Sequence, residues 1–462
     1  MLRVAPFKSV RLKNTINPWI NAEIVKMFYK RDFLHKKAID KGKDSNQWTK
    51  YVEYRNKVKR TIKKAKCEYF TSKCIENKNN SRGLWKVIKR IYPSKNKNSV
   101  NCKLTANAFN KFFSSIGNTI NNRFQSQSTT NKSKGSKCKY NFNVSNVSYA
   151  DLHRCISNLP SSSSNDVLDF DSYLLRISAD IITSYLYHIF NLSILHSYIP
   201  DDFKIARVTP VYKGKDAKDC ESNYRPISIT CHISKKLLEI QINKQLIEYL
   251  HKHNLITADQ SAFLKNHSTQ TSLHRVMDDW LQNIDDNLLT GVVYLDIEKC
   301  FDSLDHDILL NKLERYGMNT KWFKNYLCNR KQFVRFNDEL SEIRTTNIGV
   351  PQGSVLGPLL FLVYVNDLSQ NVGNDQLNMY ADDAVIYTSG KTVNELNDKL
   401  LKSMATVTKW YGNNKLAINT NKSSTMLIHS THKTLTDELQ VEINNKMLEN
   451  VESCKYIGVT VD

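Results

Sequence analysis

The feature that most constrains the fold of this chain is a pair of acidic residues between two short apolar runs. Residues 377–379 and 384–387 flank Asp382 and Asp383. Strand-forming runs on both sides of a tight polar pair predict a β-hairpin that carries both carboxylates at or near its turn. A third acid, Asp296, comes at the end of the apolar run 291–297, which predicts a short strand that ends on a carboxylate.

Helical and strand patterns alternate irregularly through the rest of the chain. Residues 205–212 alternate like a strand, whereas residues 174–195 and 233–251 have the apolar spacing of helices. No internal repeat and no regular βαβ order is present. We therefore expect an α+β fold.

Positive charge is concentrated at the start of the sequence. The formal net charge is +21, and residues 1–100 hold 27 Lys and Arg against 7 Asp and Glu. Residues 17–19, Asn-Pro-Trp, predict a helix that begins at Pro18 and extends to Asp40. A second, longer helix carries a narrow apolar stripe from Trp48 to Tyr69, so the two helices are expected to pair as a hairpin with a cationic surface. Such a surface indicates either a polyanionic partner or merely solvated helix faces, and charge alone does not separate the two.

Composition narrows the class of protein further. Residues 121–148 are rich in Asn, Ser, Thr, Lys and Gln, which is typical of a linker or a mobile insertion. No apolar run approaches the roughly 20 residues that span a bilayer, so no membrane association is expected. The ten cysteines are scattered without a Cys-x-x-Cys pair, which indicates an intracellular, reducing compartment; nucleus and cytoplasm both stay open.

The acidic residues suggest a metal-dependent chemistry. Mg²⁺ takes oxygen ligands and is usually bound by one or two carboxylates together with substrate phosphates. Two such ions stabilise the attacking and leaving oxygens of a phosphoryl transfer. Taken alone, however, an Asp-Asp pair is more often a solvated turn.

The order of the motifs gives the acids a context. Residues 296–302, 349–359 and 380–383 resemble, in this order, motifs A, B and C of the reverse transcriptases of non-LTR (LINE-type) retrotransposons. The resemblance extends on both sides of these motifs. Lys213 with residues 223–228, and residues 260–269, are similar to two fingers motifs of the family. Trp410, Asn419 and Lys422 are similar to motif D, and residues 455–459 to motif E. The basic helices resemble the segment that follows the endonuclease in the jockey-like branch.

The resemblance implies a fold and an activity. The fold would be the fingers and palm of a right-hand polymerase, with an antiparallel palm sheet backed by helices. The implied domains are a basic helical segment at 1–100, a partly helical and then low-complexity linker at 101–148, fingers at 149–275 and a palm at 276–462. The activity would be that of an RNA-directed DNA polymerase, with an RNA template, a DNA primer and dNTPs as partners. Two Mg²⁺ ions, with Mn²⁺ as a substitute, would be the cofactors.

The resemblance also assigns roles to the acidic residues. Asp296 and Asp382 would be the metal ligands, and Asp383 would be a supporting acid of the same metal site. Three neighbouring carboxylates repel one another without cations, so such a site should bind metal strongly. Lys422 would protonate the departing pyrophosphate as a general acid.

The nucleotide would be bound by a second group of residues. Lys213 and Arg225 would hold the triphosphate. Phe301, five residues after Asp296, would exclude the 2′-OH of a ribonucleotide. Gln352 and Gly353 would lie in a turn that lets the backbone approach the nucleotide or the template.

Two departures from the family pattern affect the interpretation. Ala262, Leu264 and Asn266 stand where the second fingers motif usually has glycines and an arginine, which weakens the expected grip on the template. The sequence also contains neither the family's endonuclease nor its thumb, so we expect a partial element. A non-catalytic RNA-binding remnant is therefore the alternative function. A group II intron or telomerase-type enzyme is a third interpretation, which residues 361–368 and the jockey-like front end disfavour.

Overall fold

The chain consists of two units in the computed structural model, Met1–Asn101 and Cys102–Asp462. The structure describes residues 17–39, 45–78, 80–91, 104–124, 138–160, 166–168, 170–214, 217–433 and 435–462. Over these ranges, no helix combines the length and the apolar character that crossing a bilayer requires.

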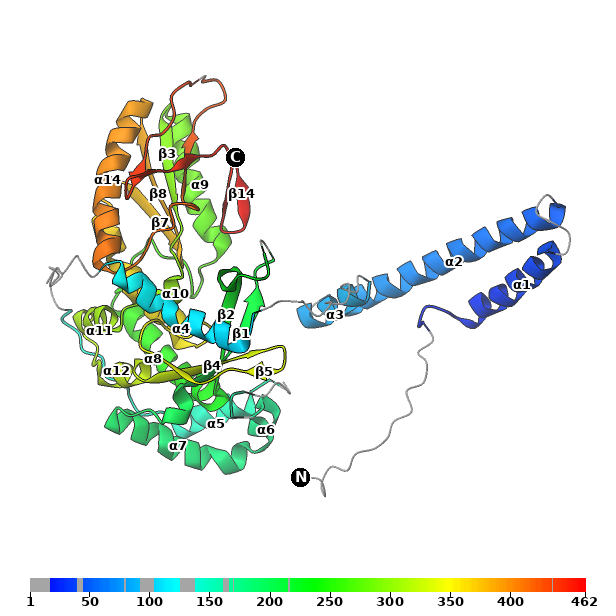
Figure 1. Cartoon of the computed structure of the whole chain (residues 1–462), viewed down its shortest axis with the longest axis horizontal. Coiled ribbons are helices and arrows are strands. Elements are labelled where there is room, and N and C mark those ends of the chain that lie inside the picture. The colour runs from blue at the N-terminus through cyan, green and yellow to red at the C-terminus, as the bar shows by residue number, and fades with distance from the viewer. Residues whose placement is uncertain are drawn as a thin grey trace. The chain divides into compact units, whose positions relative to one another are not determined.

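In the first unit, two basic helices form the predicted hairpin (Figure 1). They are α1 (Ala22–Ile39) and α2 (Asn46–Glu76), and α3 (Ser81–Ile91) follows. The rings of Trp19 and Phe70 lie 5.4 Å apart, and those of His35 and Tyr51 lie 4.6 Å apart. Because these contacts join the start of α1 to the end of α2 and the end of α1 to the start of α2, the two helices are antiparallel.

The start of α1 differs from the prediction. The helix begins at Ala22, whereas Pro18 lies in the preceding turn. The side chain of Asn21 accepts a hydrogen bond from the N–H of Ile24 at 2.9 Å, so Asn21 satisfies a helix N–H that would otherwise lack a partner. The predicted end of the helix at Asp40 lies outside the described residues.

The second unit is built around a five-stranded sheet, which we call the central sheet. Its order is β12 (Glu449–Asn450), β9 (Ser424–Ile428), β3 (Leu289–Leu295), β8 (Asp383–Gly390) and β7 (Gln376–Tyr380). All pairs are antiparallel except β9 with β12. The fold is therefore α+β, as predicted, and the strand and the hairpin predicted around the acids are present.

Helices cover both faces of the central sheet (Figure 1). Val293 and Leu295 of β3 pack in the same core as Leu400 of α14 (Val393–Asn413). The alternate residues of β3, such as Val292, pack with Trp280 of α9 (Thr269–Asp285). Every residue of β3 is buried, because a strand between two helical layers has no face left for solvent.

A second sheet surrounds β1 (Ile205–Tyr212). This strand pairs antiparallel with β2 (Tyr224–Thr230) and parallel with β4 (Arg330–Phe336), and β4 also pairs with β5 (Glu339–Leu340) and β6 (Arg344–Thr346). Helix α4 (Ala106–Asn122) packs on this sheet through Phe109 and Phe113. Residues 106–122 are thus part of the second unit, and the division into linker, fingers and palm stays a prediction.

The second unit contains further helices and two short strand pairs. They are α5 (Tyr149–Ser157), α6 (Ser172–Ile177), α7 (Ala179–His196), α8 (Glu239–Lys252), α10 (Cys300–Ser303), α11 (His306–Arg315), α12 (Lys321–Leu327), α13 (Leu356–Val365), and the pairs β10 (Glu442–Ile443) with β11 (Lys446–Met447) and β13 (Cys454–Tyr456) with β14 (Val459–Val461). The single helix predicted over 174–195 is two helices. They meet at Ser178, whose hydroxyl donates to the carbonyl of Leu174 at 2.8 Å.

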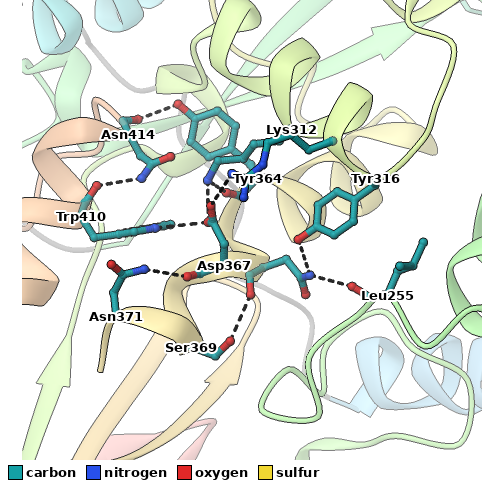
Figure 2. A network of polar contacts seen from close by, with 11 residues as sticks. Leu255, Lys312, Tyr316, Tyr364, Asp367, Ser369, Asn371, Trp410 and Asn414 are labelled. Carbon is teal, nitrogen blue, oxygen red and sulfur yellow. Dashed lines mark hydrogen bonds and ion pairs between the residues drawn. The ribbon is translucent and has the colours of Figure 1, made fainter. Parts of the chain in front are cut away.

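A buried polar network joins helices α11, α13 and α14 close to the central sheet (Figure 2). The ammonium group of Lys312 on α11 donates to Asp367 Oδ1 at 2.7 Å and to the carbonyl oxygen of Tyr364 at the end of α13. The indole N–H of Trp410 on α14 donates to the same carboxylate oxygen at 3.2 Å. The network therefore fixes α14, which covers the sheet, against α11 and α13.

Candidate active site

The central sheet brings the three predicted acids to one of its ends. Residues Ala381 and Asp382 form the two-residue turn between β7 and β8, and Asp383 is the first residue of β8. Asp296 follows the last residue of β3, and Leu295 pairs with Ala384 in the register of β3 and β8. Asp296 consequently emerges beside the turn, 86 residues away in sequence.

The acids influence one another electrostatically. Partial burial, together with the negative charges of Asp382 and Asp296, raises the pKa of Asp383 to about 6. Burial also raises the pKa of Asp296, and the charge of Asp382 adds to this increase, while Lys422 acts in the opposite direction. The thiol of Cys300 donates to Asp382 Oδ2 at 3.5 Å. These carboxylates therefore carry negative charge that the protein compensates only in part.

The segment between α14 and β9 holds Asp296 in place. The backbone N–H of Asn419 donates to the carbonyl oxygen of Asp296 at 2.8 Å, and the N–H of Asp296 donates to Ser423 Oγ at 3.2 Å. The ammonium of Lys422 lies 3.7 Å from Asp296 Oδ2, with the lysine side chain 66% exposed. Two residues of predicted motif D, Asn419 and Lys422, thus contact Asp296 of predicted motif A, and the neighbouring Ser423 adds a third contact.

The predicted motif B loop packs against the residues that follow Asp296. The N–H of Val350 donates to the carbonyl of Phe301 at 2.8 Å, and the Phe301 ring lies 5.2 Å from the ring of Phe361. Gly349 has φ +81°, and a Cβ at this position would lie only 2.8 Å from two backbone carbonyl oxygens, those of Phe301 and Asp302. Only glycine fits this close approach without a shift of the backbone.

Gln352 and Gly353 lie against both this segment and β2. The side-chain amide of Gln352 donates to Asp302 Oδ2 at 2.9 Å, and its backbone carbonyl accepts from the N–H of Ser228 at 2.9 Å. A Cβ on Gly353, at φ +125°, would lie 2.6 Å from the carbonyl oxygen of Ser228. The turn predicted from the sequence is therefore held between two elements.

Cationic side chains converge beside the acids. Lys213 follows β1, and its ammonium donates to the carbonyl oxygen of Ser222 at 2.7 Å. Burial lowers the pKa of Lys213 to about 8, and the positive charges of Lys299, Lys422 and Arg225 contribute to this decrease. An anion bound among these like charges would reduce their mutual repulsion.

Two residues of this site were not assigned from the sequence. Lys299 belongs to the cationic group, and Asp302 accepts the hydrogen bond of Gln352. Burial raises the pKa of Asp302 to about 7, while Lys299 and Gln352 oppose that increase. Their only signal in the sequence is their place within residues 296–302, because their partners come from segments far away along the chain.

The acidic residues fit a hard divalent cation. Among the described residues, no three His, Cys, Asp or Glu side chains form a group that holds a metal ion unaided. Mg²⁺, however, is usually bound by one or two carboxylates, with water and substrate phosphates as the other ligands. The carboxylate oxygens of Asp296 and Asp382, whose charge the protein compensates only in part, match this mode of binding.

Much of the chain is similar in sequence to known proteins. Residues 213–461 match the family model of the reverse transcriptases (RNA-dependent DNA polymerases). The probable RNA-directed DNA polymerase from transposon BS of Drosophila melanogaster is 30% identical over 292 residues, which is 60% of this chain and 32% of that protein. The RNA-directed DNA polymerase from mobile element jockey of the same species is 26% identical over 329 residues, or 69% of this chain and 35% of that protein. The chain thus spans about a third of the length of the curated relatives it matches.

Proposed function

Because the chain belongs to the reverse transcriptase family, we propose that it is the RNA-directed DNA polymerase of a jockey-like non-LTR retrotransposon. It would copy an RNA template by adding dNTPs to the 3′-OH of a DNA primer. The single observation that carries this proposal is the position of Asp296 at the end of β3, beside the turn that bears Asp382 and Asp383. From the family resemblance we also propose that residues 149–275 are the fingers and residues 276–462 the palm.

The acids would act as the metal site. Asp296 and Asp382 would each supply a carboxylate ligand to Mg²⁺, or to Mn²⁺ in its place, and Asp383 would support the site from the first position of β8. Two bound Mg²⁺ ions would stabilise the charge on the attacking and leaving oxygens of the in-line phosphoryl transfer. Lys422, which is exposed and already lies beside Asp296, would donate a proton to the leaving pyrophosphate.

The neighbouring residues would bind and select the nucleotide. Lys213 and Arg225 belong to a group of cations that repel one another, and the negative charge of a triphosphate would offset this repulsion. The backbone of Phe301 is bonded to the motif B loop and its ring packs against that of Phe361, a position from which the ring would exclude a 2′-OH. Gln352 and Gly353 would present the edge of the same loop to the nucleotide or to the template.

Primer extension on an RNA template tests this proposal. We expect Asp296→Asn and Asp382→Asn each to reduce the rate of nucleotide addition by at least about 100-fold, because each removes a charged oxygen ligand. Asp398→Asn, at an exposed acid of α14, is the matched control and should keep the wild-type rate. Circular dichroism should show the same fold for all three variants. A full rate in either active-site variant would refute the assignment.

The basic segment allows the alternative function to be tested in parallel. Residues 1–100 carry most of the net charge, so the chain has the electrostatic character of an RNA-binding protein whether or not it polymerises. A wild-type chain that binds RNA but adds no nucleotide in Mg²⁺ or Mn²⁺ would support the non-catalytic RNA-binding remnant instead.

A further inference from the structure

We infer that Gln260 is a positioning residue of the candidate active site and that its side-chain oxygen fixes the turn that presents Asp382. This inference rests on the proposed function for its link to catalysis. Its structural part concerns only the hydrogen bonds between residues 259–262 and the β7–β8 hairpin.

The side chain of Gln260 bridges two backbone segments. Its Oε1 accepts hydrogen bonds from the N–H of Ala262 at 2.9 Å and from the N–H of Ala381 at 3.1 Å. The residue is 1% exposed, so water does not compete for these bonds. Ala381 is the residue directly before Asp382, so the bond ends one residue from the proposed metal ligand.

The turn needs such a restraint. Ala381 has φ +59°, which is in the left-handed region that residues with a Cβ rarely adopt. A two-residue hairpin turn with this conformation usually has Asn or Gly at such a position. Since alanine has no side chain that supports the conformation, the hydrogen bond to Gln260 supplies an external stabilisation.

Backbone hydrogen bonds bring Gln260 to the turn. The N–H of Met379 on β7 donates to the carbonyl of Asp259 at 2.7 Å, and the N–H of Ser261 donates to the carbonyl of Met379 at 3.0 Å. Gln260 and Met379 form an isolated parallel bridge. Residues 259–261 therefore extend the central sheet beyond β7 and place the Gln260 side chain at the end where Asp382 lies.

The amide nitrogen of Gln260 indicates that the side-chain oxygen, the hydrogen-bond acceptor, is the group that matters at this position. This nitrogen, Nε2, is buried and has no hydrogen-bond partner among the described residues. A buried unpaired donor is unfavourable. Methionine would fill nearly the same space without this disadvantage, so packing alone does not account for an amide here.

The experiment compares Gln260→Met with Gln260→Glu and with the control Gln245→Met. Methionine removes the acceptor. Glutamate keeps an oxygen acceptor in the same place in either of its protonation states. Gln245 is a matched control because its Oε1 also accepts from a backbone N–H, that of Ser145 at 2.9 Å, on a different part of the second unit. Hydrogen exchange of peptides across residues 376–390, kcat and the KM for dNTP are measured for each full-length variant.

We expect Gln260→Met to accelerate exchange at the β7–β8 turn and to lower kcat by about tenfold or more, since small displacements of catalytic groups have large effects on rate. The KM for dNTP should change much less. Gln260→Glu should restore both turn exchange and kcat to within a few-fold of wild type. Gln245→Met should accelerate exchange near Ser145 and leave kcat unchanged.

Three results would overturn the inference. The first is unchanged hydrogen exchange at the turn in Gln260→Met. The second is an equal loss of kcat in Gln260→Met and Gln245→Met. The third is a folded Gln260→Glu whose kcat falls as much as that of Gln260→Met. If Gln260→Met does not fold, exchange and kcat in Gln260→Glu decide the question. If the wild-type chain adds no nucleotide, the proposed function fails, whereas turn exchange still decides whether Gln260 fixes the turn.

Discussion

Replacing Lys312 by methionine removes the ammonium group that donates to Asp367 in the polar network of Figure 2. The Lys312 side chain is 7% exposed and that of Asp367 is 14% exposed, so both charges lie largely out of water. The ammonium also lies 5.0 Å from the ring centre of Tyr364 and 4.8 Å from that of Trp410. The substitution therefore leaves a buried carboxylate without its main partner.

The magnitude follows from what remains around Asp367. Removing one partner of a buried ion pair typically destabilises a protein by about 3–5 kcal/mol. Arg315 Nη1 still lies 3.8 Å from Asp367 Oδ2, and Trp410 still donates to Oδ1, so part of the charge stays compensated. Methionine also occupies the space of the lysine stem, so no large cavity forms. We expect a loss of about 3 kcal/mol, the lower end of that range.

Urea unfolding of the wild type and Lys312→Met measures this loss. The matched control is Lys399→Met, because Lys399 pairs with Glu395 at 2.8 Å on the surface of α14, where solvent screens the charges and the pair contributes little to stability. The double variant Lys312→Met/Asp367→Asn should lose less than the sum of the two single variants, since it leaves no charge unpaired. If Lys312→Met destabilises no more than Lys399→Met, the network does not stabilise the fold as argued.

Three further outcomes are expected. Phe301→Val should admit ribonucleotides, because a smaller side chain frees space beside C2′; an unchanged preference for dNTPs over rNTPs in primer extension would make Phe301 only a packing residue. In urea unfolding, Asp302→Asn should become more stable relative to wild type as the pH rises from 4 to 7. The pKa of Asp302 in the folded chain, about 7, lies above its value in the unfolded chain, so the stability that protonated Asp302 gives the wild type is full below pH 4 and is lost toward pH 7. A difference in stability that stays constant with pH would contradict this. A chain that begins at Cys102 keeps α4 on its sheet but lacks the basic segment, so in fluorescence anisotropy it should bind RNA more weakly than the whole chain. The slope of log affinity against log salt concentration should be shallower by roughly 0.7 for each RNA phosphate that the basic segment neutralises. Equal slopes would make the charge a solubility feature.

Local patterns predicted the elements that carry the acids. The apolar runs around Asp382 and Asp383 are long enough to form two strands and leave only a tight turn between them, and β3 ends directly before Asp296. The same reasoning missed the break at Ser178, because the apolar spacing continues across it and the hydroxyl–carbonyl contact leaves no periodic signal. Proline is favoured at the first helical position and therefore predicts a start at Pro18, whereas in the structure the side chain of Asn21 caps the helix.

The residues that hold the site in place could not be predicted in this way. Gln260 acts on Ala381 across 121 residues of sequence, and Asp302 accepts from Gln352 across 50. Neither contact affects the spacing of apolar residues in the two segments that it joins. A local stretch of sequence therefore carries no signal of either contact. Resemblance to a family locates the motifs, but the hydrogen bonds between motifs become visible only when the chain is folded.

The charges of the site support the proposal that a metal-bound nucleotide binds there. Three carboxylates, those of Asp296, Asp382 and Asp383, lie at one end of the central sheet, and their mutual repulsion contributes to the raised pKa of Asp383. Lys213 and its cationic neighbours repel one another in the same manner. Lys422 faces both groups, since it pairs with Asp296 and also lowers the pKa of Lys213. A cation alone would relieve only the acids and an anion alone only the lysines. A triphosphate that carries Mg²⁺ relieves both, because it offers positive charge to the carboxylates and negative charge to the ammonium groups at the same time.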